Sequence, residues 1–331
     1  MLSAGLFHVE HFAAKPDSTG LPGTRLTELF HVEQISHVHN RCFPQNNLLP
    51  QSSFVTFSPL GGNLARIIAV ANQKGGVGKT TTAVSLATAL AIAEQQVLLI
   101  DCDSQANATA ALGFAKDPSR RTLYHALILN ESVDKILQKS QVSSLDVIPA
   151  DKNLAGAAVE LVASENREYK LKEFASSLRD RYKFIVMDCP PALDLLTLNA
   201  LVAADAVLVP IQCEYLALEG VSELLDTLMR IRRTLNPSLE IEGILLTMYD
   251  ERTTLSRQVA TDLRSFFGSQ IFQTIIPRNV RLAEAPSFGK PIHFYDIHSK
   301  GAESYTQLAQ EVIANAEKRL GTGTRSAHSG A

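Results

Sequence analysis

Short apolar runs alternate with longer amphipathic stretches along most of this 331-residue chain. The longer stretches have apolar residues at helical spacing, and they span 81–94, 221–235, 256–267 and 305–320. The apolar runs are rich in Val, Ile and Leu, and they span 66–72, 96–101, 145–150, 183–188, 206–212, 241–248 and 271–277. Buried strands that alternate with helices are typical of a parallel sheet covered on both faces. The pattern therefore predicts a single α/β domain over residues 64–320, with a mostly parallel β-sheet and helices on both faces.

The two ends of the chain lack this pattern. Residues 1–63 contain five prolines and no sustained strand or helix period, which indicates a disordered or extraneous extension. This extension also contains two nearly identical peptides, LFHVEH at 6–11 and LFHVEQ at 29–34. At the other end, Gly321 is placed to end the last helix, and residues 321–331 have the polar composition of a flexible tail.

Composition narrows the class of protein. A net charge of −3 gives no general attraction to nucleic acid, so DNA binding would require a local basic patch. No apolar run approaches the roughly 20 residues of a membrane span, and the N-terminus lacks the pattern of a secretory signal. The four cysteines are scattered, which favours free thiols over disulfides or a zinc site. A cytoplasmic protein is expected.

A glycine-rich segment, KGGVGKTTT at residues 74–82, follows the first predicted strand and directly precedes a predicted helix. Its spacing is the variant K-G-G-x-G-K-[ST]-[ST], because Gln73 stands where the usual phosphate loop has its first glycine. Such a loop turns backbone N–H groups and a helix N-terminus toward phosphate oxygens. Lys79 would then reach the β- and γ-phosphates, and the Thr80 hydroxyl would bind Mg²⁺. The expected phosphate-binding residues are Gly75, Gly76, Val77, Gly78, Lys79, Thr80 and Thr81.

From residue 66 to about 315 the sequence resembles the deviant Walker A ATPases, and within them the ParA/Soj family of chromosome- and plasmid-partitioning proteins. One mark of the resemblance is Lys74, which opens the loop ahead of the glycines. In that family the early lysine reaches across a dimer to the partner's nucleotide, so that ATP lies between two subunits. The resemblance thus implies a catalytic role for Lys74. Without it, a solvated surface lysine would be the expectation.

The segment VLLIDCDSQANAT at 97–109 matches a second motif of the family, with Ser104 where the family usually has proline. The resemblance implies that Asp101 supports the metal and the loop lysine. It also implies that Asp103 positions or activates the attacking water, since phosphoryl transfer needs an acceptor for the nucleophile's proton.

The segment FIVMDCPP at 184–191 resembles the family's Walker B strand. Asp188 would hold Mg²⁺ together with Thr80, through water, because Mg²⁺ keeps most of its hydration shell. The two prolines that follow resemble a nucleotide-sensing switch. A carboxylate at the end of a strand can be structural, but three of them at one edge of a parallel sheet favour a ligand site.

Residues 246–256 and 276–291 match late segments of the family, which lie near the adenine pocket and the DNA-facing surface of the dimer. Arg252 and Arg281 match the family's DNA-contacting arginines, and Arg278 is a neighbour with a weaker match. Contacts of this kind would be to phosphate, independent of sequence and sensitive to salt. The alternative for each arginine is an ordinary surface ion pair.

The resemblance implies a cytoplasmic, nucleoid-associated ATPase that uses ATP and Mg²⁺. It would form a homodimer with ATP, bind non-specific DNA and no membrane, and release DNA when a ParB-type centromere-binding protein stimulates hydrolysis. Two alternatives stay open. A MinD-like positioning ATPase cycles on membranes through a bulky amphipathic helix, which residues 305–320 support poorly. A non-enzymatic DNA-coating protein would only bind ATP and would not need Asp103.

The repeated peptide leads to a hypothesis about DNA. With plausible codons, the residues shared by 6–11 and 29–34 spell TGTTCCACGTGGAACA, which is its own reverse complement and resembles the palindromic site of ParB-type proteins. Codons beginning with CA encode only His and Gln, and the peptides differ at His11 and Gln34. Residues 1–63 would then be translated intergenic DNA, with the true start at a non-AUG codon just before the first predicted strand. Reading the gene's nucleotides tests this, and repeats that are not palindromes would exclude it.

Overall fold

The structure is a computed structural model that describes residues 65–215 and 217–326. The hypothesis about residues 1–63 lies outside the described residues, and so does the end of the expected tail, 327–331.

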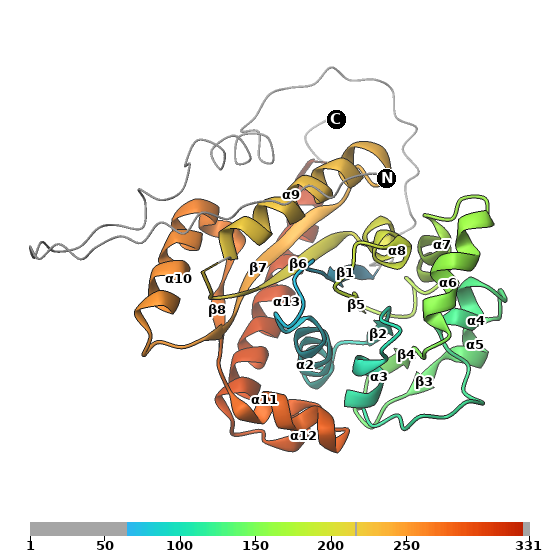
Figure 1. The fold of residues 1–331 in the computed structure, drawn as a ribbon, viewed down its shortest axis with the longest axis horizontal. Helices are drawn as coiled ribbons and strands as arrows, with labels where there is room; N and C mark the ends of the chain where they lie inside the picture. The colour runs from blue at the N-terminus through green and yellow to red at the C-terminus, as the bar shows by residue number, and fades with distance from the viewer. Residues whose placement is uncertain (1–64, 216, 327–331) are drawn as a thin grey trace, which may run out of the picture.

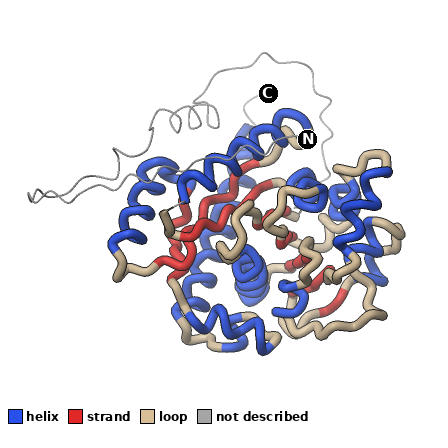
Figure 2. Tube along the Cα trace, in the orientation of Figure 1, coloured by secondary structure: helices blue, strands red, loops and turns tan. Residues whose placement is uncertain are grey.

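Eight strands form one sheet in the order β3-β4-β2-β5-β1-β6-β7-β8 (Figures 1 and 2). Neighbouring strands are parallel, except that β3 is antiparallel to β4. The strands are β1 (Arg66–Val70), β2 (Val97–Asp101), β3 (Gln138–Lys139), β4 (Leu145–Ile148), β5 (Phe184–Asp188), β6 (Ala206–Gln212), β7 (Glu240–Tyr249) and β8 (Ile271–Pro277). All seven apolar runs of the sequence form strands, so the prediction of a mostly parallel α/β sheet is confirmed.

Helices cover both faces of the sheet (Figure 1). On one face the apolar residues pack with those of α2 (Lys79–Ile92), α3 (Asn107–Ala111), α11 (Val280–Glu284), α12 (Ile292–Tyr295) and α13 (Lys300–Ser326). On the other face they pack with those of α4 (Leu123–Leu127), α5 (Val133–Ile136), α6 (Leu154–Glu160), α7 (Lys170–Ser176), α8 (Leu195–Ala203), α9 (Ala217–Thr234) and α10 (Thr254–Phe267). Short 3₁₀ turns are η2 (Leu161–Ala163), η3 (Gly268–Gln270) and η4 (Ala285–Phe288).

Each strand except β3 supplies residues to two cores. Successive side chains of a strand point to opposite faces of the sheet. In β1, Ile67 and Ala69 therefore lie in the core under α4 to α10, whereas Ile68 and Val70 lie in the core under α2 and α13. Burial on both faces explains why the apolar runs are continuous and do not alternate with polar residues.

Two elements differ from the expectation. The strand β3 has only two residues, too few for any period to predict it. The helix α13 begins five residues before the expected position and continues past Gly321 to Ser326. A single glycine costs a helix only about 1 kcal/mol relative to alanine, so it need not end a long helix. The prediction that Gly321 ends this helix is therefore wrong.

A fully buried hydrogen bond joins the two long helices of one face. The hydroxyl groups of Thr82 in α2 and Tyr305 in α13 lie 3.0 Å apart, and both side chains are buried in the core. Burial raises the pKa of Tyr305 far above its ordinary value, so this phenol is neutral. The bond fixes the helix that follows the glycine-rich loop against the last helix of the chain.

Two glycines bring distant segments into backbone contact. Gly113, after α3, and Gly289, after η4, have φ angles of 86° and 61°. A Cβ atom on Gly113 would lie 2.9 Å from the carbonyl oxygen of Gly289, and a Cβ atom on Gly289 would lie 3.0 Å from Cα of Gly113. Only glycine fits both the conformation and the space. The segment that follows β2 thus touches the segment that follows β8.

Candidate nucleotide site

Three neighbouring strands end side by side at the carboxyl edge of the sheet. The strand β5 lies between β2 and β1, and Asp188 at its end is in register with Asp101 on one side and Val70 on the other. The glycine-rich loop follows β1, so it begins beside these carboxylates. Open parallel sheets bind ligands at this edge. The convergence expected from the sequence is therefore present.

Side chains outside the glycine motif anchor the loop. Asn72 donates from Nδ2 to the carbonyl oxygen of Pro210 at 2.8 Å, and its Oδ1 accepts from the backbone N–H of Lys74 at 2.9 Å. Thr247 of β7 donates from Oγ1 to the carbonyl oxygen of Val77 at 2.9 Å. The loop is thus tied to β6 and β7. Neither anchor is predicted from the sequence, where the available signal is a polar residue near the carboxyl end of an apolar strand.

The loop ends at Gly78, directly before α2. Gly76 and Gly78 have φ angles of 75° and 89°, which side chains rarely adopt. Lys79 is only 7% exposed, and its Nζ donates to the carbonyl oxygen of Lys74 at 2.9 Å. Burial lowers the pKa of Lys79, and the charge of Asp188 opposes this fall. The ammonium group is therefore held over the loop, where phosphates are expected.

Asp188 has the properties of a metal ligand. It is fully buried, and neither carboxylate oxygen has a hydrogen-bond partner among the described residues. Burial raises the pKa of Asp188 well above its usual value and the charge of Asp101 adds to the rise, whereas the Thr80 hydroxyl and the Lys79 ammonium oppose it. A buried carboxylate without a partner, near a hydroxyl, fits a hard cation bound through oxygen. Thr80 and Asp188 therefore fit the predicted Mg²⁺ site.

Asp103 lies two residues beyond β2 and is 8% exposed, and its Oδ1 accepts from the N–H of Gln105 at 2.9 Å. Asp101 is fully buried, and its carboxylate accepts hydrogen bonds from the same segment of the chain. It accepts from the N–H of Asp103 at 3.1 Å, and from the N–H and the hydroxyl of Thr109 at 2.8 Å and 2.7 Å. Among the described hydrogen bonds of Asp101 there is none to Lys79, the contact that the family resemblance had implied.

Lys74 has an ion-pair partner in its own chain. Its Nζ lies 3.2 Å from Oε2 of Glu214, which follows β6, and both side chains are partly exposed. The other oxygen of Glu214 accepts a short hydrogen bond from Gln212. A contact between Lys74 and a second subunit's nucleotide would have to replace this ion pair.

The three arginines of the expected DNA-facing surface are exposed, and two of them are paired. Arg252 contacts Asp250 with Nη2 to Oδ2 at 2.7 Å and Nε to Oδ1 at 2.8 Å. This ion pair lowers the pKa of Asp250 to about 2. Arg281 lies 3.0 Å from Glu284 and 3.5 Å from Asp296. The exposure of Arg252 and Arg281 fits a contact with DNA, and their carboxylate partners fit ordinary surface ion pairs.

A cavity of about 470 Å³ opens beside the start of α2, within the range of small-molecule sites. Its lining includes Thr80 and Thr81 from α2, Asn107 from α3, and most of the segment 282–292. The late segment 276–291, which the resemblance placed near the nucleotide, thus reaches the end of the phosphate loop.

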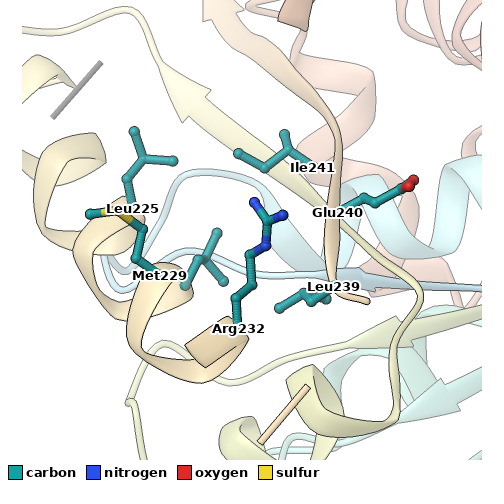
Figure 3. A pocket seen from close by; sticks show the side chains of 7 residues that line it. Leu225, Met229, Arg232, Leu239, Glu240 and Ile241 are labelled. Atoms are coloured by element: carbon teal, nitrogen blue, oxygen red, sulfur yellow. The ribbon is translucent and has the colours of Figure 1, made fainter. Parts of the chain in front are cut away.

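A second hollow lies between α9 and the start of β7 (Figure 3). Because β7 is parallel to its neighbours, its start lies at the sheet edge opposite to the strand ends that carry the carboxylates. Its volume of about 20 Å³ leaves room for roughly one water molecule. Figure 3 shows the side chains around it, which come from Leu225, Met229, Arg232, Leu239, Glu240 and Ile241. A nucleotide does not fit there, so the loop edge is the candidate site.

A family model described as an AAA domain matches residues 65–241. The chain is 51% identical over 250 residues to the chromosome partitioning protein ParA of Myxococcus xanthus, and the matched region covers 76% of this chain and 88% of that protein. It is 50% identical over 252 residues to the sporulation initiation inhibitor protein Soj of Bacillus subtilis, and the matched region covers 76% of this chain and 100% of that protein.

Among solved structures, the fold is similar to that of cobyrinic acid a,c-diamide synthase from Mycobacterium smegmatis, determined with bound ADP and magnesium. The TM-score is 0.65 at 36% identity, and the match covers 75% of this chain and 93% of the other.

Proposed function

Because this chain belongs to the ParA/Soj family of chromosome-partitioning ATPases, we propose that it acts as a nucleotide-controlled switch in DNA segregation. It hydrolyses ATP to ADP and phosphate and uses Mg²⁺. The observation that carries the proposal is the arrangement of three adjacent strands. Asp188 ends β5, the loop with Lys79 follows β1 and Asp103 follows β2. Burial lowers the pKa of Lys79, and the charges of Asp188 and Asp103 both raise it.

The proposed chemistry assigns one task to each part of the site. The N–H groups of residues 75–81 and the ammonium of Lys79 bind the phosphate oxygens. Thr80 and Asp188 hold Mg²⁺, which neutralises charge on the β- and γ-phosphates. Asp103 orients the attacking water and accepts its proton. Its low exposure keeps bulk water away from the carboxylate.

Lys74 is proposed to act between subunits. In an ATP-bound homodimer it would leave Glu214 and reach the phosphates of the partner's nucleotide. Exposure of about 39% for its side chain makes such a movement inexpensive, because an exposed ion pair contributes only about 0–1 kcal/mol. Closure of the dimer would then depend on ATP, and hydrolysis would open it.

The dimer is proposed to bind DNA through phosphate contacts from Arg252, Arg278 and Arg281. The binding would be non-specific and would associate the protein with the nucleoid in the cytoplasm. A ParB-type centromere-binding protein would stimulate hydrolysis and so release the dimer from DNA. Slow hydrolysis without this partner suits a switch whose output is a conformation.

The MinD-like alternative would need a helix free to lie on a membrane surface. No helix among residues 65–215 and 217–326 is both long and apolar enough to cross a membrane. In α13, the apolar residues Leu308 and Val312 are fully buried against the sheet face that carries α2. This helix therefore has no exposed apolar stripe over its described side chains for a lipid surface.

We expect Arg281→Ala to weaken binding to duplex DNA of random sequence at least roughly tenfold at about 0.1 M salt, and Arg252→Ala to add to the loss. Each lost phosphate contact should also flatten the salt dependence by about 0.9 unit of log–log slope. ATP-dependent dimerisation, followed by light scattering, should persist. Fluorescence anisotropy with labelled DNA over a salt series measures both effects.

Arg181→Ala is the matched control. Arg181 is likewise exposed and paired with one carboxylate, Asp134, but it lies beyond α7 on the other half of the sheet. This variant should bind DNA like the unmodified protein. DNA affinity unchanged by Arg281→Ala with Arg252→Ala would favour the interpretation that these arginines are ordinary surface ion pairs.

A further inference from the structure

Thr109 is the residue through which the Asp103 segment is fastened to the sheet. Its side chain is 3% exposed, and its hydroxyl makes two hydrogen bonds. It donates to Oδ2 of Asp101 at 2.7 Å and accepts from the N–H of Ala150 at 3.0 Å. Ala150 follows β4, and Asp101 ends β2, so one hydroxyl links two neighbouring strand ends to α3.

Asp101 passes this link on to Asp103. One of its oxygens is bonded to Thr109 and the other accepts from the backbone N–H of Asp103 at 3.1 Å. The carboxylate of Asp101 therefore holds both ends of the segment 103–109. With these three hydrogen bonds, both of its oxygens are engaged within the segment.

The segment between these two ends contains a strained residue. Ala106, which precedes α3, has a φ angle of 56°, in the left-handed region that a side chain disfavours. Such a conformation persists where surrounding contacts determine it. Here the bonds of Asp101 to both ends of the segment hold Ala106 in this conformation. The resulting tight turn keeps the carboxylate of Asp103 near the edge of the sheet, where its Oδ1 accepts from the N–H of Gln105.

We infer that Thr109 is a positioning residue for ATP hydrolysis, which acts through Asp101 to hold the Asp103 carboxylate at the attacking water. The inference rests on the proposed role of Asp103. Thr109 itself touches neither the loop 75–78 nor Asp188 through any described hydrogen bond. Its removal should therefore change the turnover number and leave nucleotide affinity unchanged.

The test is a comparison of Thr109→Val with Thr109→Ser. Valine keeps the shape of threonine and lacks the hydroxyl, whereas serine keeps the hydroxyl. We expect Thr109→Val to lower the single-turnover rate of ATP hydrolysis about tenfold or more, because misplacement of a catalytic group by 1 Å can cost on the order of 100-fold. The dissociation constant of ATP, measured by calorimetry, should stay within about twofold. Thr109→Ser should retain most of the rate.

A double-variant experiment separates positioning from a general structural role. If Thr109 acts through Asp103, then Thr109→Val should have no further effect on hydrolysis in an Asp103→Ala background. An equal loss in both backgrounds, a parallel loss of ATP affinity, or an unchanged rate in Thr109→Val would each overturn the inference. Should Thr109→Val not fold, Thr109→Ala against Thr109→Ser gives the same comparison. An unchanged rate in Asp103→Ala alone would instead overturn the proposed role of Asp103.

Discussion

Replacement of Asp103 with alanine is expected to lower ATP hydrolysis by about 100- to 10,000-fold, the usual range for loss of a general base. ATP binding should survive, because Asp103 makes no described hydrogen bond to the phosphate loop or to Asp188. The dimer should therefore form with ATP and stay on DNA. Release of radiolabelled phosphate measures the rate, and light scattering with DNA-binding assays follows the trapped dimer.

Asp117→Ala is the control for the loss of one negative charge. Asp117 lies in the same part of the chain and is exposed, and its Oδ1 accepts from the N–H and the hydroxyl of Ser119. This variant should hydrolyse ATP at the unmodified rate. A monomeric Asp103→Ala protein at saturating ATP would contradict the assigned role, and so would hydrolysis by the Asp103→Ala variant at the unmodified rate. Absence of measurable, DNA-stimulated hydrolysis by the unmodified protein would favour the alternative of a protein that only binds ATP.

Mixing two inactive variants is expected to restore activity if Lys74 acts between subunits. In a heterodimer of Lys74→Ala with Asp103→Ala, the nucleotide of the Lys74→Ala subunit has its own Asp103 and the partner's Lys74. The other nucleotide has neither. An equal mixture that pairs at random should therefore recover about a quarter of the unmodified rate, since half of the dimers carry one complete site of two.

Each variant alone should be nearly inactive, and Lys74→Ala should still bind ATP, because Lys79 and the loop anchors are unchanged. A mixture of Lys74→Ala with a Lys74→Ala, Asp103→Ala double variant is the matched control, and it should show no recovery. Absence of recovery in the first mixture, with heterodimers demonstrated by tagged subunits, would place Lys74 at the nucleotide of its own subunit or exclude it from catalysis.

The sheet was predictable because its strands are buried on both faces. Continuous runs such as 66–72 and 183–188 have no other simple explanation, and parallel pairing then brings their carboxyl ends together. The meeting of Asp101 and Asp188 follows from that topology alone. The strand β3 was not predictable, because two residues that pair at an edge carry no pattern.

The hydrogen bonds that anchor the phosphate loop could not be predicted from the sequence. Asn72 bonds to a carbonyl 138 residues away, and Thr247 bonds to one 170 residues away. Local spacing does not encode such contacts, which depend on the finished fold. By contrast, the ion pair of Arg252 with Asp250 joins residues two positions apart, so the neighbouring sequence already contained that alternative for the arginine.

The backbone contact of Gly113 with Gly289 has a mechanical consequence. Side chains at most contacts can change rotamer and so absorb a displacement, but here two peptide backbones touch with no side chain between them. Such a contact cannot adjust by rotation of either residue's side chain. Movement of the segment that follows β2 would therefore be transmitted through backbone contact to the segment that follows β8, which carries Arg281. A side chain at either Gly113 or Gly289 would push the two backbone segments apart.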